Sequence, residues 1–455
     1  MRAKPKKPRH FKTDLGNAHQ LVARHGKDLR YCHPWRKWLA WDGARWKRDE
    51  TGEIERRAKE TVTAMLLSAA RGPDTDARDR AKKHAIQSQS AGRIRAMISL
   101  ADTEPGIPVT PDQLDCHPYL LNCLNGTLDL RTGVLREHRR EDLITKLAPI
   151  EYDPKAECPN FEKFLGRIAG DDADLIAFIR RSFGYALTGA VTEKAIFVLY
   201  GKGDNGKTTL LEAIRHVLGD YAGQIPIESL MAKQNNGVPN DIAQLKGLRF
   251  VTSSEAEQGR RLAEAKVKEL TGMGMVQARY LYGEFFHFDP THKLFIDSNY
   301  KPEIRGTDNA IWNRLRLIPF NVSIPDHEKD RKLLEKLKAE SAGILAWAVQ
   351  GCLEWQQNGL GEPSLVRQAT IAYRDEMDSV VQFIEEECRR GSGLEEPSEM
   401  LHGAYLLWCD ACGEEALGTK AFGTRLGELG FERSKLAGSR SWKGIGLRRE
   451  EGKAA

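Results

Sequence analysis

One short segment constrains the fold more than any other part of the chain. Residues 201–208 read GKGDNGKT, which fits the phosphate-loop pattern G-x-x-x-x-G-K-[ST]. The apolar run AIFVLY at 195–200 precedes the loop and is typical of a buried parallel strand. TLLEAIRHVL at 209–218 follows it with apolar residues at helical spacing. A strand, a glycine-rich loop and a helix in this order predict a P-loop in an α/β domain.

The loop has a specific chemistry. Its glycines let backbone N–H groups wrap phosphates at a helix N-terminus, which already favours anions. We expect Lys207 to reach the β- and γ-phosphates of ATP and Thr208 to hold Mg²⁺, so the predicted cofactors are ATP and Mg²⁺. The residues expected to contact the nucleotide are Gly201, Asp204, Asn205, Gly206, Lys207, Thr208 and Thr209.

Two further strands are predicted to end in polar residues. LRFVTSSEAE at 248–257 ends its apolar part at Glu255, which can polarise the attacking water or support Mg²⁺. A solvated loop residue is the competing interpretation of Glu255, and Glu257 leaves the division of labour open. KLFIDSN at 293–299 ends in Asn299, a side chain suited to orienting water beside the γ-phosphate.

A fourth strand is predicted at 314–320, where RLRLIPF begins with Arg314 and Arg316. In a ring, an arginine from one subunit can reach the phosphate bound by the next and stabilise charge in the transition state. The alternative is that one or both arginines pair with surface carboxylates.

The length of 455 residues predicts about three domains. The expected class is α/β: an AAA+-like P-loop ATPase core with a parallel sheet, a small N-terminal α+β region and a C-terminal winged-helix-like domain. A hinge is expected at Gly-Ser-Gly 391–393. The predicted parts are an N-terminal region (1–150), a helical collar or linker (151–190), the ATPase (191–325), a helical region (326–390) and the winged-helix-like domain (391–455).

The segment WRKWLAWDGARWKRD at 35–49 combines tryptophans with basic residues. The favoured interpretation is a β-hairpin that turns at Asp42-Gly43 and buries its tryptophans. The alternative is a nucleic-acid surface, on which the rings stack on bases and the cations contact phosphates.

Composition limits the other classes. The net charge of +5 permits a nucleic-acid partner without requiring one. No apolar stretch approaches the roughly 18 residues of a membrane span, so no membrane partner is expected. The N-terminal MRAKPKKPRH lacks the apolar core of a signal peptide and is expected to be a solvated tail. Cys409-Asp-Ala-Cys412 lies in a helical pattern without a second metal-binding pair, so we expect no metal there. The scattered cysteines indicate a reducing cytoplasm.

Several motifs occur together in one order: GKGDNGKTT, the SSE strand end, LTGMGMVQARYLYGEFFHFDP, KLFIDSNYKP and NAIWNRLRLIPF. In this the chain resembles superfamily 3 helicases, most closely the helicase part of phage and plasmid primase-helicases, whose relatives include the poxvirus primase-helicase. The resemblance covers roughly residues 10–325. It implies an AAA+-like core in a hexameric ring that uses ATP and Mg²⁺ to translocate on single-stranded DNA, usually 3′ to 5′.

The resemblance also implies residue roles. Glu255 would be the Walker B acid, Asn299 the sensor and Arg314 the arginine finger, with Arg316 in reserve. The segment with Arg279, Tyr280 and Tyr282 resembles the hairpin that contacts DNA in the ring pore; an internal β-hairpin with buried tyrosines is the equal alternative.

The sequence departs from the family in three ways. Gly272-Met273-Gly274 stands where the family has Gly-Gly-Asp, so the acid that precedes the hairpin is missing. The Walker B strand offers one certain carboxylate instead of an adjacent pair. No primase module is recognised ahead of the motor, so we expect no primer synthesis and a separate primase partner.

The C-terminal segment at 419–448 resembles a winged helix, with Phe422, Leu426 and Leu429 at helical spacing and Trp442 in a β-wing. Its basic residues are expected to contact DNA phosphates; a small protein-docking domain is the alternative. The basic residues of this segment are Arg425, Arg433, Lys435, Arg440 and Lys443.

The leading hypothesis is an ATP-driven, hexameric DNA helicase that acts on single-stranded, forked and origin DNA of a phage, plasmid or integrated element in a bacterial cytoplasm. One alternative keeps the ATPase without unwinding, as a DNA-stimulated loader or defence switch. Another is an origin-recognition protein that uses ATP for assembly.

Overall fold

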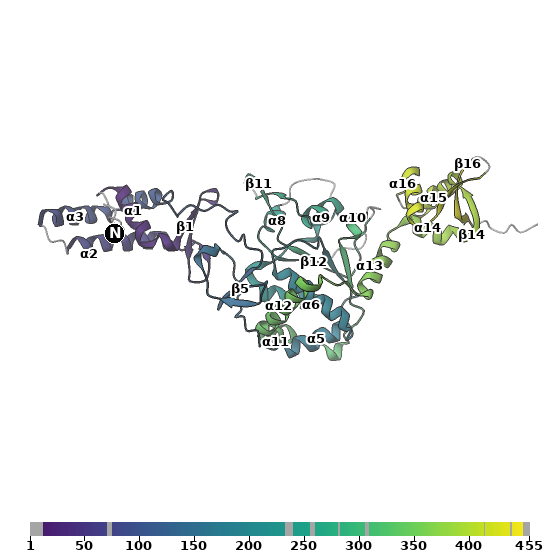
Figure 1. Ribbon diagram of the computed structural model, residues 1–455, viewed down its shortest axis with the longest axis horizontal. Helices are drawn as coiled ribbons and strands as arrows, with labels where there is room; N and C mark the ends of the chain where they lie inside the picture. Colours follow the sequence, from purple (N-terminus) through teal and green to yellow (C-terminus); the bar gives the residue numbers. More distant parts are fainter. Residues whose placement is uncertain are drawn as a thin grey trace, which may run out of the picture.

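The computed structural model of the chain describes residues 12–70, 75–232, 240–254, 260–280, 283–304, 309–413, 415–436 and 439–448. Three parts follow one another along its longest axis: an N-terminal helical part, a central parallel sheet with helices, and a C-terminal unit reached through α13 (Figure 1). The predicted mixed α/β class is confirmed by the five-stranded parallel sheet. None of the described helices is long and apolar enough to cross a membrane.

The N-terminal part contains the predicted tryptophan hairpin. Its turn is held by Asp42, whose Oδ1 accepts hydrogen bonds from the backbone N–H groups of Ala44 and Arg45, both at 2.9 Å. Trp46 is fully buried and donates its indole N–H to the carbonyl of Arg140 at 2.8 Å. The hairpin interpretation is therefore confirmed. The elements of this part are α1 (Asp14–His25), β1 (Leu29–Cys32), β2 (Lys37–Trp41), β3 (Trp46–Arg48), α2 (Glu53–Ala70), α3 (Thr75–Ser88), α4 (Ala91–Ala101), β4 (Leu120–Cys123), β5 (Gly126–Asp129) and β6 (Val134–Arg136).

The central sheet is parallel throughout, in the order β13-β7-β12-β9-β8. Both faces are covered, so its strands are apolar on both sides: in β7, Phe197 and Leu199 belong to one core cluster, and Ile196 and Val198 belong to the other. The strands of the sheet and of the adjacent hairpin are β7 (Ile196–Tyr200), β8 (Ala222–Gln224), β9 (Phe250–Ser254), β10 (Val276–Arg279), β11 (Phe285–Phe288), β12 (Lys293–Ser298) and β13 (Leu315–Pro319).

The helices on one face form a single core with the sheet. Helices α6 and α12 cross at two glycines: a Cβ on Gly184 would lie 2.1 Å from the Cys352 nitrogen, and one on Gly351 would lie 2.2 Å from the Arg180 oxygen. The segment expected as a collar or linker (151–190) therefore packs directly on the helices and strands of the central part. The helices of the central part are α5 (Pro159–Ala169), α6 (Ala173–Leu187), α7 (Lys207–Leu218), α8 (Asn240–Ala243), α9 (Glu264–Leu270), α10 (Asn309–Trp312), α11 (Leu333–Ala339), α12 (Ser341–Asn358) and α13 (Ser364–Glu376).

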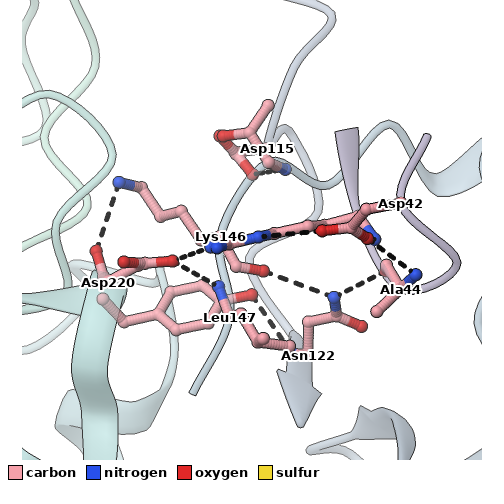
Figure 2. A network of polar contacts seen from close by, with 10 residues as sticks. Asp42, Ala44, Asp115, Asn122, Lys146, Leu147 and Asp220 are labelled. Carbon is pink, nitrogen blue, oxygen red and sulfur yellow. Dashed lines mark hydrogen bonds and ion pairs between the residues drawn. The ribbon is translucent and has the colours of Figure 1, made fainter. Parts of the chain in front are cut away.

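A polar network joins the N-terminal part to the end of α7 (Figure 2). Arg45, from the tryptophan hairpin, forms an ion pair with Asp220. The same carboxylate accepts the backbone N–H of Leu147 at 3.1 Å. The Asn122 amide donates to the carbonyls of Ala44, at 2.9 Å, and Lys146, at 3.3 Å. Arg45, one of the cations of the alternative nucleic-acid surface, is thus used in an internal contact.

The C-terminal unit has its own core and a three-stranded antiparallel sheet in the order β14-β16-β15. Helix α14 contributes Val380 and Phe383 to this core, which also buries Trp442 of β16. The expected hinge at 391–393 is wrong, because these residues lie inside β14; the glycines stand where the register with β16 shifts, between Arg390 and Glu395. The elements are α14 (Ser379–Glu387), β14 (Cys388–Pro397), α15 (Ser398–Cys412), α16 (Thr419–Glu428), β15 (Glu432–Leu436) and β16 (Ser439–Leu447).

Candidate nucleotide-binding site

The P-loop connects β7 to α7, as the sequence predicts. Gly206 has a φ of 80°, and a Cβ there would lie 2.8 Å from the Phe164 ring. A Cβ on Gly201 would lie 2.3 Å from the carbonyl oxygen of Phe320. Both positions therefore require glycine, one for its backbone conformation and both for space. Helix α7 begins at Lys207, so its first N–H groups face the loop.

Lys207 is almost completely buried, with 3% of its surface exposed. Its ammonium group donates to the Gly201 carbonyl at 2.9 Å, to Asn205 Oδ1 at 2.8 Å and to Asn299 Oδ1 at 3.1 Å. The structure thus brings together four residues that the sequence assigned to one site. Protein oxygens therefore surround the ammonium group that is expected to meet phosphate.

Strand order explains the position of Asn299. Because β12 lies directly beside β7 and runs parallel to it, the carboxyl ends of the two strands meet at one edge of the sheet. Asn299 follows β12 at that edge, next to the loop that follows β7. A crevice outside the carboxyl ends of parallel strands is where open α/β sheets bind ligands.

A second side chain at this edge, Asp297, was not assigned from the sequence. Thr208 donates its hydroxyl to Asp297 Oδ2 at 2.5 Å, and the Lys207 ammonium lies 3.7 Å from Asp297 Oδ1. A signal was present, because Asp297 and Asn299 are two residues apart and alternate residues of a strand share a face. The carboxylate and hydroxyl are hard oxygen donors, which fit Mg²⁺. Among the described residues no group of three His, Cys, Asp or Glu could hold a metal, so a cation here would also need the nucleotide's phosphates and water.

Beside the loop lies a pocket of about 710 Å³, lined by Asp204, Gly206 and Thr209. Phe164 and Leu333 give it apolar walls suited to a nucleotide base. This pocket was not predicted from the sequence, because its walls come from α5, the P-loop, and α11 with the segment before it, which are far apart in the chain. Its charged lining residues are Lys163, Arg167, Asp171, Asp204, Glu328, Lys329, Asp330 and Lys336.

One of the pocket's cations is held by two carboxylates. Lys329 lies 2.7 Å from Asp326 and 3.0 Å from Asp204. The hydrogen bonds that the Lys329 ammonium donates to these two carboxylates raise the pKa of Lys329, with Asp326 the larger cause. Asp204 thus faces the pocket and not the buried side of the loop, where Asn205 lies.

Glu255, Glu257 and Tyr282 lie outside the described residues. Strand β9 is present as expected and ends at Ser254, directly before Glu255.

Arg314 and Arg316 lie at the other edge of the sheet. The Arg314 carbonyl accepts a hydrogen bond from the N–H of Ile196, the first residue of β7, so Arg314 is a whole strand away from its own P-loop. Its guanidinium donates to the Ala310 carbonyl at 2.7 Å. Arg316 lies 3.7 Å from Glu362, which matches the surface-pairing interpretation for that residue.

The segment with Arg279 and Tyr280 forms the antiparallel hairpin β10–β11. Arg279 is exposed, and its guanidinium lies 5.0 Å from the centre of the Phe285 ring. Tyr280 is 47% exposed and stacks on Phe286 at 5.1 Å. Of the two interpretations, the described tyrosine matches the exposed hairpin better than a buried one.

In the C-terminal unit, Lys435, Arg440 and Lys443 are exposed on the β15–β16 hairpin. Arg425 is different: its side chain is 7% exposed and forms a 2.5 Å ion pair with Asp378. The expected DNA contact by Arg425 is therefore corrected, since this arginine ties α16 to the start of α14 inside the unit.

Comparisons with known proteins identify the families that parts of this chain resemble. Three family models match separate parts of the chain: a D5 N-terminal-like family at 18–170, a family of unknown function at 199–314, and a poxvirus D5 protein-like family at 375–442. The chain carries D5-type domains. Its resemblance to the helicase part of the primase-helicase family, expected from the sequence, is thereby confirmed.

The similar proteins come from large DNA viruses. A putative helicase of Acanthamoeba polyphaga mimivirus is 30% identical over 294 residues, which cover 60% of this chain and 30% of that protein. A putative helicase of frog virus 3 is 26% identical over 388 residues, covering 67% of this chain and 40% of that protein. A putative primase of African swine fever virus is 30% identical over 211 residues, covering 45% and 22%. This chain thus spans less than half the length of each of these three relatives.

Among solved structures, the apo form of the NrS-1 C-terminal region is similar to this chain, with 10% identity and a TM-score of 0.47, covering 97% of this chain and 100% of that one. The D5-type domains and the relatives' names support a replicative, helicase-like role.

Proposed function

We propose that the chain is an ATP- and Mg²⁺-dependent DNA helicase that works as a hexameric ring and translocates 3′ to 5′ on single-stranded DNA. It would act at replication forks or origins of a phage, plasmid or integrated element in the cytoplasm of a bacterial host, together with a separate primase. The AAA+ character of the core and the roles of Glu255, Asn299 and Arg314 are part of this proposal.

The contact between Lys207 and Asn299 carries the ATPase part. The side chain of Lys207, at the start of α7, and that of Asn299, directly after β12, meet 3.1 Å apart at the sheet edge where ligands bind. With Thr208 and Asp297 beside them, they supply a phosphate-binding lysine, an amide for positioning water and oxygen ligands for a cation. Bound Mg²⁺ would neutralise charge on the phosphates, while these residues bind and orient the nucleotide.

The position of Arg314 supports a ring. It lies beside the first residue of β7, so four strand residues, ~13 Å, separate its backbone from the P-loop end of that strand. An arginine at the amino edge can act on a phosphate only in a neighbouring subunit. The exposed hairpin with Arg279 and Tyr280 supplies a cation and a ring suited to single-stranded DNA.

The test measures strand displacement on forked DNA with a 3′ or a 5′ tail, comparing the wild type with Lys207→Ala and Arg314→Ala. We expect ATP-dependent displacement from the 3′ tail only, and its loss in both variants. A mixture of the two variants is expected to regain part of the ATPase activity, because an interface that pairs an intact P-loop with an intact Arg314 forms again.

Arg215→Ala is the matched control, because Arg215 lies on α7 and pairs with Glu212 away from the loop. ATP hydrolysis that DNA stimulates, without displacement from either tail, would refute the helicase and favour the loader or switch. Gly274, in place of the family acid, is the observation that supports that second candidate.

A further inference from the structure

The carboxylate of Asp297 has no role in the P-loop pattern, yet it faces the loop with both oxygens. Oδ2 accepts the Thr208 hydroxyl at 2.5 Å, and Oδ1 lies 3.7 Å from the Lys207 ammonium. Only 7% of Asp297 is exposed. A buried carboxylate is costly unless it is paired and hydrogen-bonded, so its place beside the loop calls for a cation in every state of the site.

The register of the sheet shows what Asp297 replaces. In parallel pairing, Asp297 lies beside Leu199 of β7 on one side and beside Ser254 of β9 on the other. Ser254 directly precedes Glu255, so it is the position at which an adjacent pair of acids would carry its first carboxylate. Here that position holds a serine, and an acid stands at the same level one strand nearer to the P-loop.

The chemistry of the pair fits a magnesium ligand. In P-loop enzymes the cation is held by the loop Ser or Thr and by an acid from a neighbouring strand. Mg²⁺ takes one or two carboxylates plus phosphates and keeps several waters, so a single carboxylate beside Thr208 is sufficient. The Lys207 ammonium lies 3.7 Å from Asp297 Oδ1, and Mg²⁺ beside Thr208 would give this carboxylate a second cation.

We propose that Asp297, in place of an acid at position 254, is the carboxylate that holds Mg²⁺ beside Thr208, directly or through a water. Glu255 is then left for the attacking water. This assignment rests on the proposed ATPase function and names the cation ligand of that site.

The test measures nucleotide binding without turnover. A fluorescent ADP is titrated into wild type, Asp297→Asn and Glu212→Gln, in EDTA and in Mg²⁺, and bound Mn²⁺ is counted by electron paramagnetic resonance in the presence of ADP. Glu212→Gln is the control, since Glu212 lies on α7 and pairs with Arg215. We expect Asp297→Asn to bind ADP as the wild type does in EDTA, to lose about tenfold of the Mg²⁺-dependent gain in affinity, and to bind less Mn²⁺.

A second variant separates ligation from support of the loop. Because position 254 lies in register with Asp297, the double variant Ser254→Asp/Asp297→Asn is expected to recover Mg²⁺-dependent binding. An unchanged Mg²⁺ gain in Asp297→Asn, or equally weakened binding in EDTA, would overturn the assignment. Wild type that binds no nucleotide would overturn the proposed function as well, so the two failures are distinguishable.

Discussion

Acid is expected to destabilise the central sheet through one buried histidine. His292 directly precedes β12 and is 3% exposed. Burial, and secondly the neighbouring Lys293, lower the pKa of His292 from 6.5 to about 3. Between pH 6.5 and about pH 3, His292 is therefore protonated in the unfolded chain and neutral in the folded chain. The contribution of neutral His292 to the free energy of unfolding is therefore complete above pH 6.5 and is lost as the pH falls towards 3.

The magnitude follows from the two pKa values. Each pH unit between them changes the free energy of unfolding by about 1.4 kcal/mol. Between pH 7 and pH 5, which lies 1.5 units below the unfolded pKa, the loss is about 2 kcal/mol. We expect urea unfolding to show this loss in the wild type and not in His292→Gln. Tryptophan fluorescence is a suitable probe, because Trp347 and Trp355 lie in the core beside the sheet.

The test depends on the difference between the wild type and His292→Gln in the free energy of unfolding lost between pH 7 and pH 5, since other groups titrate in the same range. Burial also lowers the pKa values of His25, His84 and His216, and those histidines remain in the variant. A wild-type slope equal to that of His292→Gln between pH 7 and pH 5 would refute the reasoning.

Two further outcomes are expected. Gly274→Asp should fold normally, because nothing lies within 4 Å of a Cβ there. If the missing family acid couples DNA contact to hydrolysis, single-stranded DNA should stimulate ATP hydrolysis more strongly in this variant than in the wild type. Equal stimulation in the two proteins would exclude this coupling. Arg425→Met should destabilise the C-terminal unit by about 3 kcal/mol, since it leaves Asp378 buried without its partner; hydrogen exchange should quicken in α14 and α16 and stay unchanged in the central sheet, whereas uniform exchange rates would contradict the internal role.

Local patterns were sufficient for most of the fold. The apolar run of β7, the P-loop and the periodicity of α7 lie in one continuous segment, so the sequence predicts all three. The Asp42-Gly43 turn was predictable for the same reason, because turn chemistry is local. The hinge prediction at 391–393 was wrong, because glycines favour a hinge when only local sequence is considered. In the structure these residues lie in an irregular part of β14, where its register with β16 shifts.

The site was predicted less completely than the fold. Asn299 was predicted as a site residue because it ends a strand. Asp297 can be assigned to the site only when β12 is known to lie between β7 and β9, because this order places its carboxylate beside the P-loop. Arg425 was misjudged because a basic residue in a basic segment resembles a DNA contact, and its partner Asp378 is 47 residues away in the chain. Strand order and long-range pairs are the information that one sequence lacks.

The two edges of the sheet give the proposed motor its direction of coupling. The carboxyl edge carries the P-loop, Asp297 and Asn299, whereas the amino edge carries Arg314 and the start of β12. The hairpin β10–β11 ends at Phe288, and four residues separate it from β12. Lys293, the first residue of β12, holds the start of that strand in place by donating to the Thr188 carbonyl. The chain therefore leaves the hairpin and enters the sheet at the amino ends of its strands, the same end at which Arg314 lies. In a ring, a phosphate bound by one subunit would be sensed by the neighbour's Arg314, which directly precedes β13, two strands from the start of β12 in the same sheet. Hydrolysis in one subunit would then move the DNA contact of the next, which is why the proposed activity requires the assembled ring.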